Sequence, residues 1–325
     1  MKNDPVQSAL AALDNVPLRT PEGRAQLVKA LASKSNLVAA KAARITGDAQ
    51  WVELADDLVK AFDRFITRGS IPDKGCVALI AIARALYGLD YDDAELFLKG
   101  MRHVQMEPVW GGSVDTAVEL RAVCAMGLAS TRYSDTLREL VDLLADSEWQ
   151  ARAGAARAIG SIAANGSEAA SLLLRLKALT GDREPDVIAD CFSGLLGASG
   201  QNAVRFVTSF AEARDPEVRD AAILSLGASR RPEAIEWLKE RFGAVADVAT
   251  RKCILLSLAT SRTEAAMEFL LVVIRDGSEQ ASAMAVAAME ISRADPRIQA
   301  EVTKALQERA RKYQAPGCGD GRETG

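Results

Sequence analysis

Apolar residues recur along this chain three and four positions apart, which is the spacing of amphipathic α-helices. One kind of segment is rich in small residues, as in R-A-G-A-A-R-A-I-G at 152–160. A second kind, at 167–179, 233–242 and 263–274, places Leu, Val and Phe on one face. No segment shows the alternation of apolar and polar positions that predicts a half-buried strand. The pattern therefore predicts an all-α fold in which helices of these two kinds alternate.

The polar segments that open the small-residue helices resemble one another. Examples are D-S-E-W-Q-A-R at 146–152 and A-R-D-P-E-V-R at 213–219. The last residues of successive copies are 31 positions apart from Arg121 to Arg152 and 36 apart from Arg152 to Ile188. Further copies end at Arg219 and Arg251, and weaker ones at Lys41, Leu79 and Ser282. This period predicts an array of about eight helix pairs.

The segment D-P-E-V-R-D-A-A-I-L-S-L-G at 215–227 resembles a HEAT repeat of the short bacterial type that occurs in phycobilin lyases. Tetratricopeptide repeats have a similar period, but their W-x-x-L-G-x-x-Y signature is missing from this chain. The resemblance implies a right-handed α-solenoid of about eight HEAT-like helix pairs. It also implies an extended concave surface, which we expect the second helix of each pair to line.

Composition and helix signals suggest how the chain is organised around this array. Thr20, Pro21 and Glu22 form a good helix start, so residues 1–32 are expected to hold an N-terminal segment and a capping helix. The repeat array is expected over 33–312, with an inserted loop near 101–114. The Gly-rich stretch 313–325 is predicted to be a disordered tail.

Charge and residue counts exclude several classes of function. The net charge is −4 and the sequence pI is about 5.4, so nucleic acid is not an expected partner. The single histidine excludes metal sites built from several His ligands, and we expect no metal and no cofactor. With no long apolar run and no secretory signal pattern, the chain is not expected to enter a membrane, and its default location is the cytoplasm.

The cysteines do not form a recognisable motif. There are five of them, widely spaced and without a C-x-x-C pair, so we expect reduced thiols rather than disulfides or a zinc site. Cys124, Cys191 and Cys253 fall within small-residue helices, which predicts packing rather than catalysis.

The insertion near 101–114 breaks the repeat and is the first candidate contact site. A Trp in an insertion most often packs its ring between two repeats and closes the loop onto the core, and this is the first expectation for Trp110. The functional alternative is that Trp110 presents its ring to a partner, with His103, Glu107 and Asp115 adding polar contacts. One His and one carboxylate are too few ligands for a metal site.

A second group of candidate contacts lies later in the chain. Trp237 and Lys239 occur in a locally basic stretch with interleaved acidic residues, and Arg205 is expected on the same concave surface. These mixed charges fit a protein or peptide partner better than a polyanion.

The sequence thus predicts a non-catalytic interaction scaffold or regulatory adaptor that binds its partner on the concave surface. The resemblance leaves two alternatives open, a HEAT-like DNA glycosylase and a tetrapyrrole lyase or chaperone subunit. The acidic pI opposes the first, and the second shares only the repeat architecture. The related dimetal hydroxylase that modifies a lysine needs several His–Glu pairs, which a chain with one histidine cannot supply. The oligomeric state is left open.

Overall fold

A computed structural model describes residues 4–67, 72–198 and 202–314 of the chain. Within these residues there are eighteen α-helices, four short 3-10 helices and one two-stranded sheet. Eight helices, α3, α5, α7, α9, α11, α13, α15 and α17, begin where the sequence predicts the repeats to begin, and each is followed in the chain by a second helix. The predicted α-helical solenoid of eight helix pairs is therefore confirmed, with the small sheet as an addition.

The chain divides into two compact units, Met1–Ala198 and Ser199–Gly325. The helices of the first unit are α1 (Pro5–Ala12), α2 (Pro21–Leu31), α3 (Asn36–Asp48), α4 (Ala55–Ile66), α5 (Val77–Gly88), α6 (Ala94–Met101), α7 (Val118–Ser130), α8 (Thr136–Leu143), α9 (Trp149–Ala164), α10 (Glu168–Thr180) and α11 (Pro185–Gly197). Those of the second are α12 (Asn202–Phe210), α13 (Pro216–Ala228), α14 (Pro232–Ala244), α15 (Val248–Ser261), α16 (Glu264–Asp276), α17 (Glu279–Met289) and α18 (Pro296–Gln314).

Short polar side chains fix where many of these helices begin. Thr20 Oγ1 accepts a hydrogen bond of 3.0 Å from the Gly23 amide at the start of α2. Asp247 accepts one of 2.8 Å from the Thr250 amide at the start of α15. Such caps satisfy amides that have no partner inside the helix.

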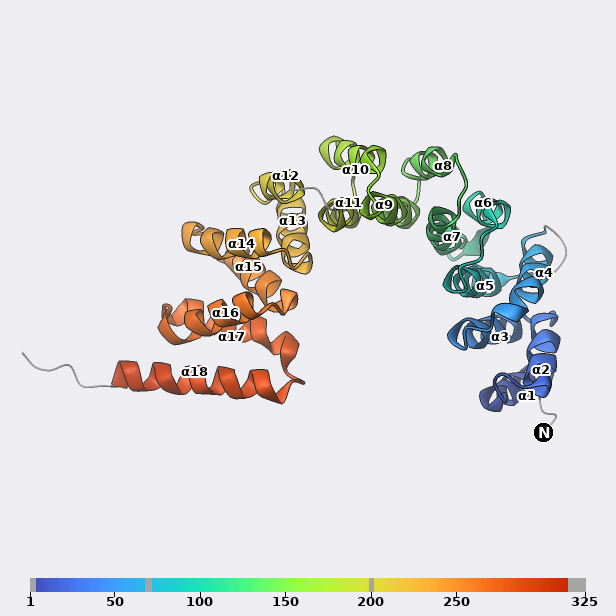
Figure 1. Ribbon diagram of the computed structural model, residues 1–325, viewed down its shortest axis with the longest axis horizontal. Helices are drawn as coiled ribbons and strands as arrows, with labels where there is room; N and C mark the ends of the chain where they lie inside the picture. The colour runs from blue at the N-terminus through green and yellow to red at the C-terminus, as the bar shows by residue number, and fades with distance from the viewer. Residues whose placement is uncertain (1–3, 68–71, 199–201, 315–325) are drawn as a thin grey trace, which may run out of the picture. The chain divides into compact units, whose positions relative to one another are not determined.

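The helices of the first unit form two layers. The first helices of the pairs, α3, α5, α7, α9 and α11, pack on one another in succession, and Figure 1 shows them along the inner side of this unit's curve. The second helices, α4, α6, α8 and α10, lie outside them. The expectation that second helices line the concave face is therefore wrong for this unit. A repeat period fixes the spacing of helices but does not determine which of the two lies inside.

Small residues bring the inner helices close together. A Cβ at Gly154 would overlap Ala122 of the preceding inner helix, and Gly160 packs directly on Gly194 of the next one. The interface between the layers holds larger side chains, and Phe62, Phe97 and Phe192 are fully buried. Close backbone contact in one layer and bulky apolar packing between layers together account for the two kinds of helix in the sequence.

The repeated Asp and Arg link successive pairs in the first unit. Arg121 Nε lies 3.0 Å from Asp146 Oδ2, and Arg152 Nη2 lies 2.7 Å from Asp182 Oδ1. The next equivalent position holds Ile188. Its side chain is uncharged and cannot form an ion pair, so this series of ion pairs ends there. In the second unit, Arg251 instead lies over the Phe242 ring, 4.4 Å from its centre.

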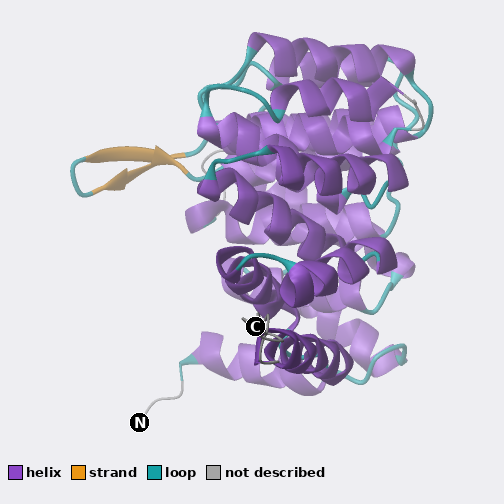
Figure 2. Cartoon of the chain, turned by 90° about the vertical axis from the view of Figure 1, so that its left-hand side faces the viewer, coloured by secondary structure: helices purple, strands orange, loops and turns teal. Residues whose placement is uncertain are grey.

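The inserted segment is a β-hairpin rather than a loop. Strands β1 (Met106–Val109) and β2 (Gly112–Asp115) pair antiparallel, and Figure 2 shows the hairpin projecting away from the helices. These strands leave little signal in the sequence because each has only four residues. Both faces are largely exposed, so burial imposes no alternation of apolar and polar positions.

Two further expectations concern the end of the chain and membranes. The tail predicted over 313–325 lies outside the described residues from 315 onward, and α18 continues to Gln314. In the part of the chain that the structure describes, no helix is both long and apolar enough to cross a membrane.

Candidate functional site

The carboxylate of Glu107 fixes the base of the hairpin by accepting hydrogen bonds from other residues of the chain. Glu107 Oε1 accepts from the Gly75 amide at 2.6 Å, from Gln105 Nε2 at 2.7 Å and from Thr116 Oγ1 at 2.9 Å. The hydrogen bond from the Gly75 amide is the main cause that lowers the pKa of Glu107. Gln105 Nε2 also donates to the carbonyl of Asp73 at 2.7 Å. These contacts tie β1 to the turn that precedes α5.

Asp115 anchors the other strand to the repeat array. Its Oδ2 lies 2.6 Å from Arg121 Nη1, and its Oδ1 accepts from the amides of Gln105 and Ala117, each at 3.0 Å. Arg121 also donates to the carbonyl of His103 at 3.0 Å. Burial alone would raise the pKa of Asp115, but the hydrogen bonds from Arg121 and the two amides outweigh it and lower the pKa. Asp115 is therefore a buried structural anion.

The tip of the hairpin carries a fully exposed tryptophan. Trp110 has a relative exposure of 103%, and it precedes Gly111, whose φ of 93° closes the turn in a conformation that favours glycine. The apolar side chains of Met106, Val109 and Val114 are also exposed, at 57%, 51% and 46%. The expectation that the Trp110 ring packs between two repeats is wrong, because the hairpin carries the ring away from them.

The sequence-predicted residues of the insertion do not converge on one ligand. Trp110 lies at the tip, whereas Glu107 and Asp115 are occupied at the base. His103 is half-buried, with Nε2 at 3.4 Å from Gln105 Oε1. Among the described residues no three His, Cys, Asp or Glu side chains are placed to hold a metal ion. The arrangement is that of an anchored projection with an apolar tip.

The later candidates belong to the second unit. Arg205 on α12 is exposed, and Trp237 on α14 is half-buried. Lys239 Nζ lies 2.8 Å from Glu236 Oε1 on the same helix, which is a partly exposed pair. The hairpin belongs to the first unit, so these three side chains form a separate group from Trp110.

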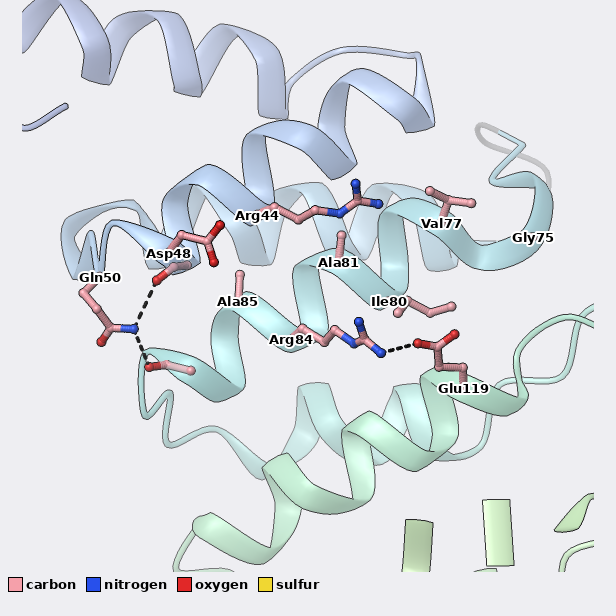
Figure 3. A pocket seen from close by; sticks show the side chains of 12 residues that line it. Arg44, Asp48, Gln50, Gly75, Val77, Ile80, Ala81, Arg84, Ala85 and Glu119 are labelled. Atoms are coloured by element: carbon pink, nitrogen blue, oxygen red, sulfur yellow. Dashed lines mark hydrogen bonds and ion pairs between the residues drawn. The ribbon is translucent and has the colours of Figure 1, made fainter. Parts of the chain in front are cut away.

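A shallow pocket of about 640 Å³ lies on the inner face, where α3, α5 and α7 meet (Figure 3). Gly47 and Ala85 line it together with charged side chains. Arg84 of α5 is ion-paired with Glu119 of α7, and Arg44 of α3 also lines the pocket. No sequence pattern signals this pocket, because its small lining residues serve helix packing equally well and its charges belong to three different repeats.

An exposed apolar groove of about 550 Å³ runs between α8 and α10. Leu172, Leu176 and Leu179 are 56%, 58% and 66% exposed and follow one another on a single face of α10. The sequence carries a signal for this groove, because L-L-L-R-L-K-A-L at 172–179 holds more leucines than one buried helix face requires.

Several solved structures show a weak likeness to this chain. The chain is similar to the complex of CpcE and CpcF of phycocyanin lyase from Nostoc sp. PCC7120, with 18% identity, 91% of this chain and 96% of that chain covered, and a TM-score of 0.36. Human deoxyhypusine hydroxylase gives 15% identity, coverage of 90% and 92%, and a TM-score of 0.30. An engineered protein has 18% identity, with 97% of this chain and 92% of that chain covered, and a TM-score of 0.41. Likenesses of this size do not extend to function.

Sequence comparison assigns the family more directly. No curated protein shows a significant match to the chain. The family described as HEAT repeats matches residues 113–195, 173–254 and 206–290, which together span more than half of the 325 residues. These matches cover helices of both units and agree with the paired helices and the linking Arg–Asp pairs, and the chain belongs to the HEAT-repeat family.

Proposed function

We propose that this chain is a non-catalytic scaffold or adaptor that binds a protein partner through the hairpin 106–115, with Trp110 as the anchoring side chain. The observation that carries the proposal is the full exposure of Trp110 on a projection with a fixed base. A large aromatic side chain in water gains free energy when a partner covers it, and a rigid one loses little conformational entropy on binding. Trp is also among the residues that contribute most to protein interfaces.

The state of the polar residues favours binding over catalysis. Glu107 and Asp115 each accept three hydrogen bonds from the chain's own groups, so their carboxylates act as structural acceptors. Both pKa values are lowered, whereas a general acid or base at neutral pH needs a raised carboxyl pKa. The hairpin therefore offers contact area rather than proton transfer.

The charges on the concave surface of the first unit favour a second contact with a protein partner there. Ion pairs there join Arg84 to Glu119 and Arg157 to Asp190, the latter at 2.7 Å between Nη1 and Oδ2. This face therefore carries charges of both signs. Such a surface fits a mixed-charge protein better than nucleic acid, whose binding needs an excess of cations.

The test is affinity capture from a native lysate of the source organism with the wild-type chain and the Trp110→Ala variant. Nuclease treatment, a salt series, mass spectrometry and an absorbance scan are applied to each eluate. We expect a stoichiometric protein that survives nuclease and is lost with Trp110→Ala. Because the Trp110 side chain is fully exposed among the described residues, the free energy of unfolding should change by less than about 0.5 kcal/mol.

The matched control is Leu179→Ala, which removes an exposed apolar side chain from another surface of the same unit. Partner capture should be unchanged in that variant. Equal capture by wild type and Trp110→Ala would contradict the hairpin proposal. Nucleic acid lost steeply with salt would favour the glycosylase alternative, and a coloured tetrapyrrole would favour the lyase or chaperone alternative.

A further inference from the structure

Hydrogen-bonded and non-hydrogen-bonded residue pairs alternate along the hairpin, and their order determines which backbone N–H and C=O groups point outward. The Thr116 amide donates to the Gln105 carbonyl at 2.9 Å, so residues 105 and 116 form a hydrogen-bonded pair. In antiparallel strands such pairs alternate with pairs whose N–H and C=O groups point away from each other. The register then makes 107 with 114 and 109 with 112 hydrogen-bonded pairs, and turns the backbone groups of 106, 108, 113 and 115 outward.

The two edges of the hairpin differ in their capacity to take another strand. On β1 the outward position nearest the tip is Pro108, which has no N–H to donate. On β2 the corresponding position is Ser113, which is exposed and presents both an N–H and a C=O. Proline on a strand edge prevents pairing there. Only the β2 edge can therefore accept a strand over the outer half of the hairpin.

The side chains around this edge are apolar and uncharged. No residue from Pro108 to Val114 carries a charge, and the one acid in β1, Glu107, is held at the base. Val109 and Val114 are exposed on one face of the hairpin, and Met106 lies on the other. A ligand that covers both faces of the hairpin and the Trp110 ring must be concave. Because the outer half of the β2 edge carries no charge, a strand without charged side chains fits beside it.

We propose that β2 is a docking edge for an extended, uncharged segment of a partner protein, which adds to the hairpin as a third strand beside Trp110. This inference rests on the proposed function and specifies how the partner is recognised. Backbone hydrogen bonds to Ser113 supply part of the affinity, and the apolar side chains supply specificity. A second copy of this chain fits less well. Specific dimers bury about 1,200–2,000 Å² in total, and two four-residue strands meeting edge to edge bury much less.

The experiment uses a library of random linear peptides of about twelve residues, long enough to span a strand and flanking contacts. Peptides are selected on the full-length wild-type chain and counter-selected on Trp110→Ala, so that only hairpin binders are kept. The dissociation constant of a fluorescent copy of the best peptide is then measured with wild type, Ser113→Pro and Ser113→Ala. Amide exchange of Ser113 and Val114 is followed with and without the peptide.

We expect Ser113→Pro to weaken binding about tenfold or more, because it leaves a buried acceptor of the peptide unpaired. Ser113→Ala keeps the N–H and should bind within about twofold of wild type. In the wild-type chain the peptide should slow exchange of the Ser113 amide. Protection of the Val114 amide in free Ser113→Pro shows that the hairpin itself has formed, since Val114 bonds inward to β1.

Each other result overturns the inference. Binding that needs Trp110 but is unchanged in Ser113→Pro leaves the proposed function standing and removes strand addition. Selection of no peptide that protects Ser113 removes it as well. If sedimentation shows a dimer that Ser113→Pro dissociates, the β2 edge serves a second copy of the chain instead of a partner strand. The capture experiment with Trp110→Ala tests the proposed function separately.

Discussion

Arg121 Nη1 lies 2.6 Å from Asp115 Oδ2, and this contact joins the hairpin to the repeat array. The same guanidinium reaches Asp146, whose Oδ2 is 3.0 Å from its Nε. Arg121 is only 3% exposed, and the two carboxylates are 7% and 16% exposed. One residue of the repeat pattern therefore both links successive helix pairs and fixes the projection that carries Trp110.

We predict that Arg121→Met destabilises the chain by about 3–5 kcal/mol, because it leaves two mostly buried carboxylates without their cation. The measurement is the free energy of unfolding by urea, together with amide exchange in the hairpin. Exchange at Thr116, whose amide bonds to Gln105, should become faster because Asp115 loses its anchor.

The control for this variant is Arg84→Met. Arg84 and Glu119 form an ion pair whose side chains are 63% and 53% exposed, so its loss should cost less than about 1 kcal/mol. Equal destabilisation by the two variants would contradict the role assigned to burial around Arg121.

Asp182 predicts a dependence of stability on pH. Burial would raise its pKa, but hydrogen bonds from Arg152 and Lys177, with the Glu184 amide, outweigh burial and hold the pKa far below its usual range. A carboxyl whose pKa is lowered in the folded state stabilises the fold above its unfolded pKa of about 3.9. That stability is lost as pH falls from about 5 toward the folded pKa.

Urea unfolding between pH 7 and pH 3 measures this effect. We expect the free energy of unfolding of wild type to fall below about pH 5, and Asp182→Asn to show lower stability at pH 7 with a smaller further decrease in acid. Asp92→Asn is the control, because its partner Arg132 is 92% exposed and solvent screens the pair. A decrease in acid that is the same in wild type and Asp182→Asn would show that other carboxyls dominate.

The repeat architecture was predictable because its physical causes recur in the sequence. Each pair needs a capped helix of small residues for close backbone contact and a second helix with one apolar face, and from Arg121 onward these patterns return about every 31 to 36 positions. The Arg–Asp links follow the same period. Ile188 departs from this series because it stands where the two preceding copies have Arg. The first compact unit ends at Ala198, a short distance further along the chain.

The candidate site was predictable only as a break in the pattern. Trp110 and the glycines marked the insertion, but the strands depend on contacts with residues far away in sequence. Glu107 accepts a hydrogen bond from Gly75, 32 positions earlier, and no local pattern signals that contact. The sequence likewise did not distinguish a packed Trp110 ring from an exposed one, because that depends on the direction in which the hairpin leaves the array.

The cysteines provide a prediction about chemical reactivity. Burial raises the pKa values of Cys76, Cys191 and Cys253 to about 12. Burial also raises the pKa of Cys124. Because the thiolate is the reactive form, these four should react with iodoacetamide at pH 8 at least about a hundredfold more slowly than a free cysteine.

Intact-mass measurement over time tests this prediction. The experiment uses a Cys318→Ser background, which leaves only the four cysteines of the described residues. In urea all four should be alkylated at the rate of a free thiol. Rapid labelling of any of them in the native chain would show that its helix pair opens readily.

Two glycines in the second unit should respond in opposite ways to the same substitution. Gly227 of α13 lies against Ser257 of α15, and an added Cβ would overlap both the Oγ and the backbone carbonyl of Ser257. Ser257 Oγ also donates to the Ile223 carbonyl at 2.6 Å, so the serine cannot move aside without losing that bond. Gly227→Ala should therefore push α13 and α15 apart and destabilise the chain by about 1–3 kcal/mol.

Gly243 of α14 has open space at the Cβ position, with no described atom within 4 Å. Gly243→Ala should stabilise the chain by about 0.5–1 kcal/mol, since alanine has the higher helix propensity and restricts the unfolded chain. Urea midpoints of the two variants against wild type measure both effects. Because the substitution and the unit are the same, opposite signs would isolate interhelical contact as the cause. A loss of stability in both variants would instead mean that α14 also packs closely at Gly243, which contradicts the described packing.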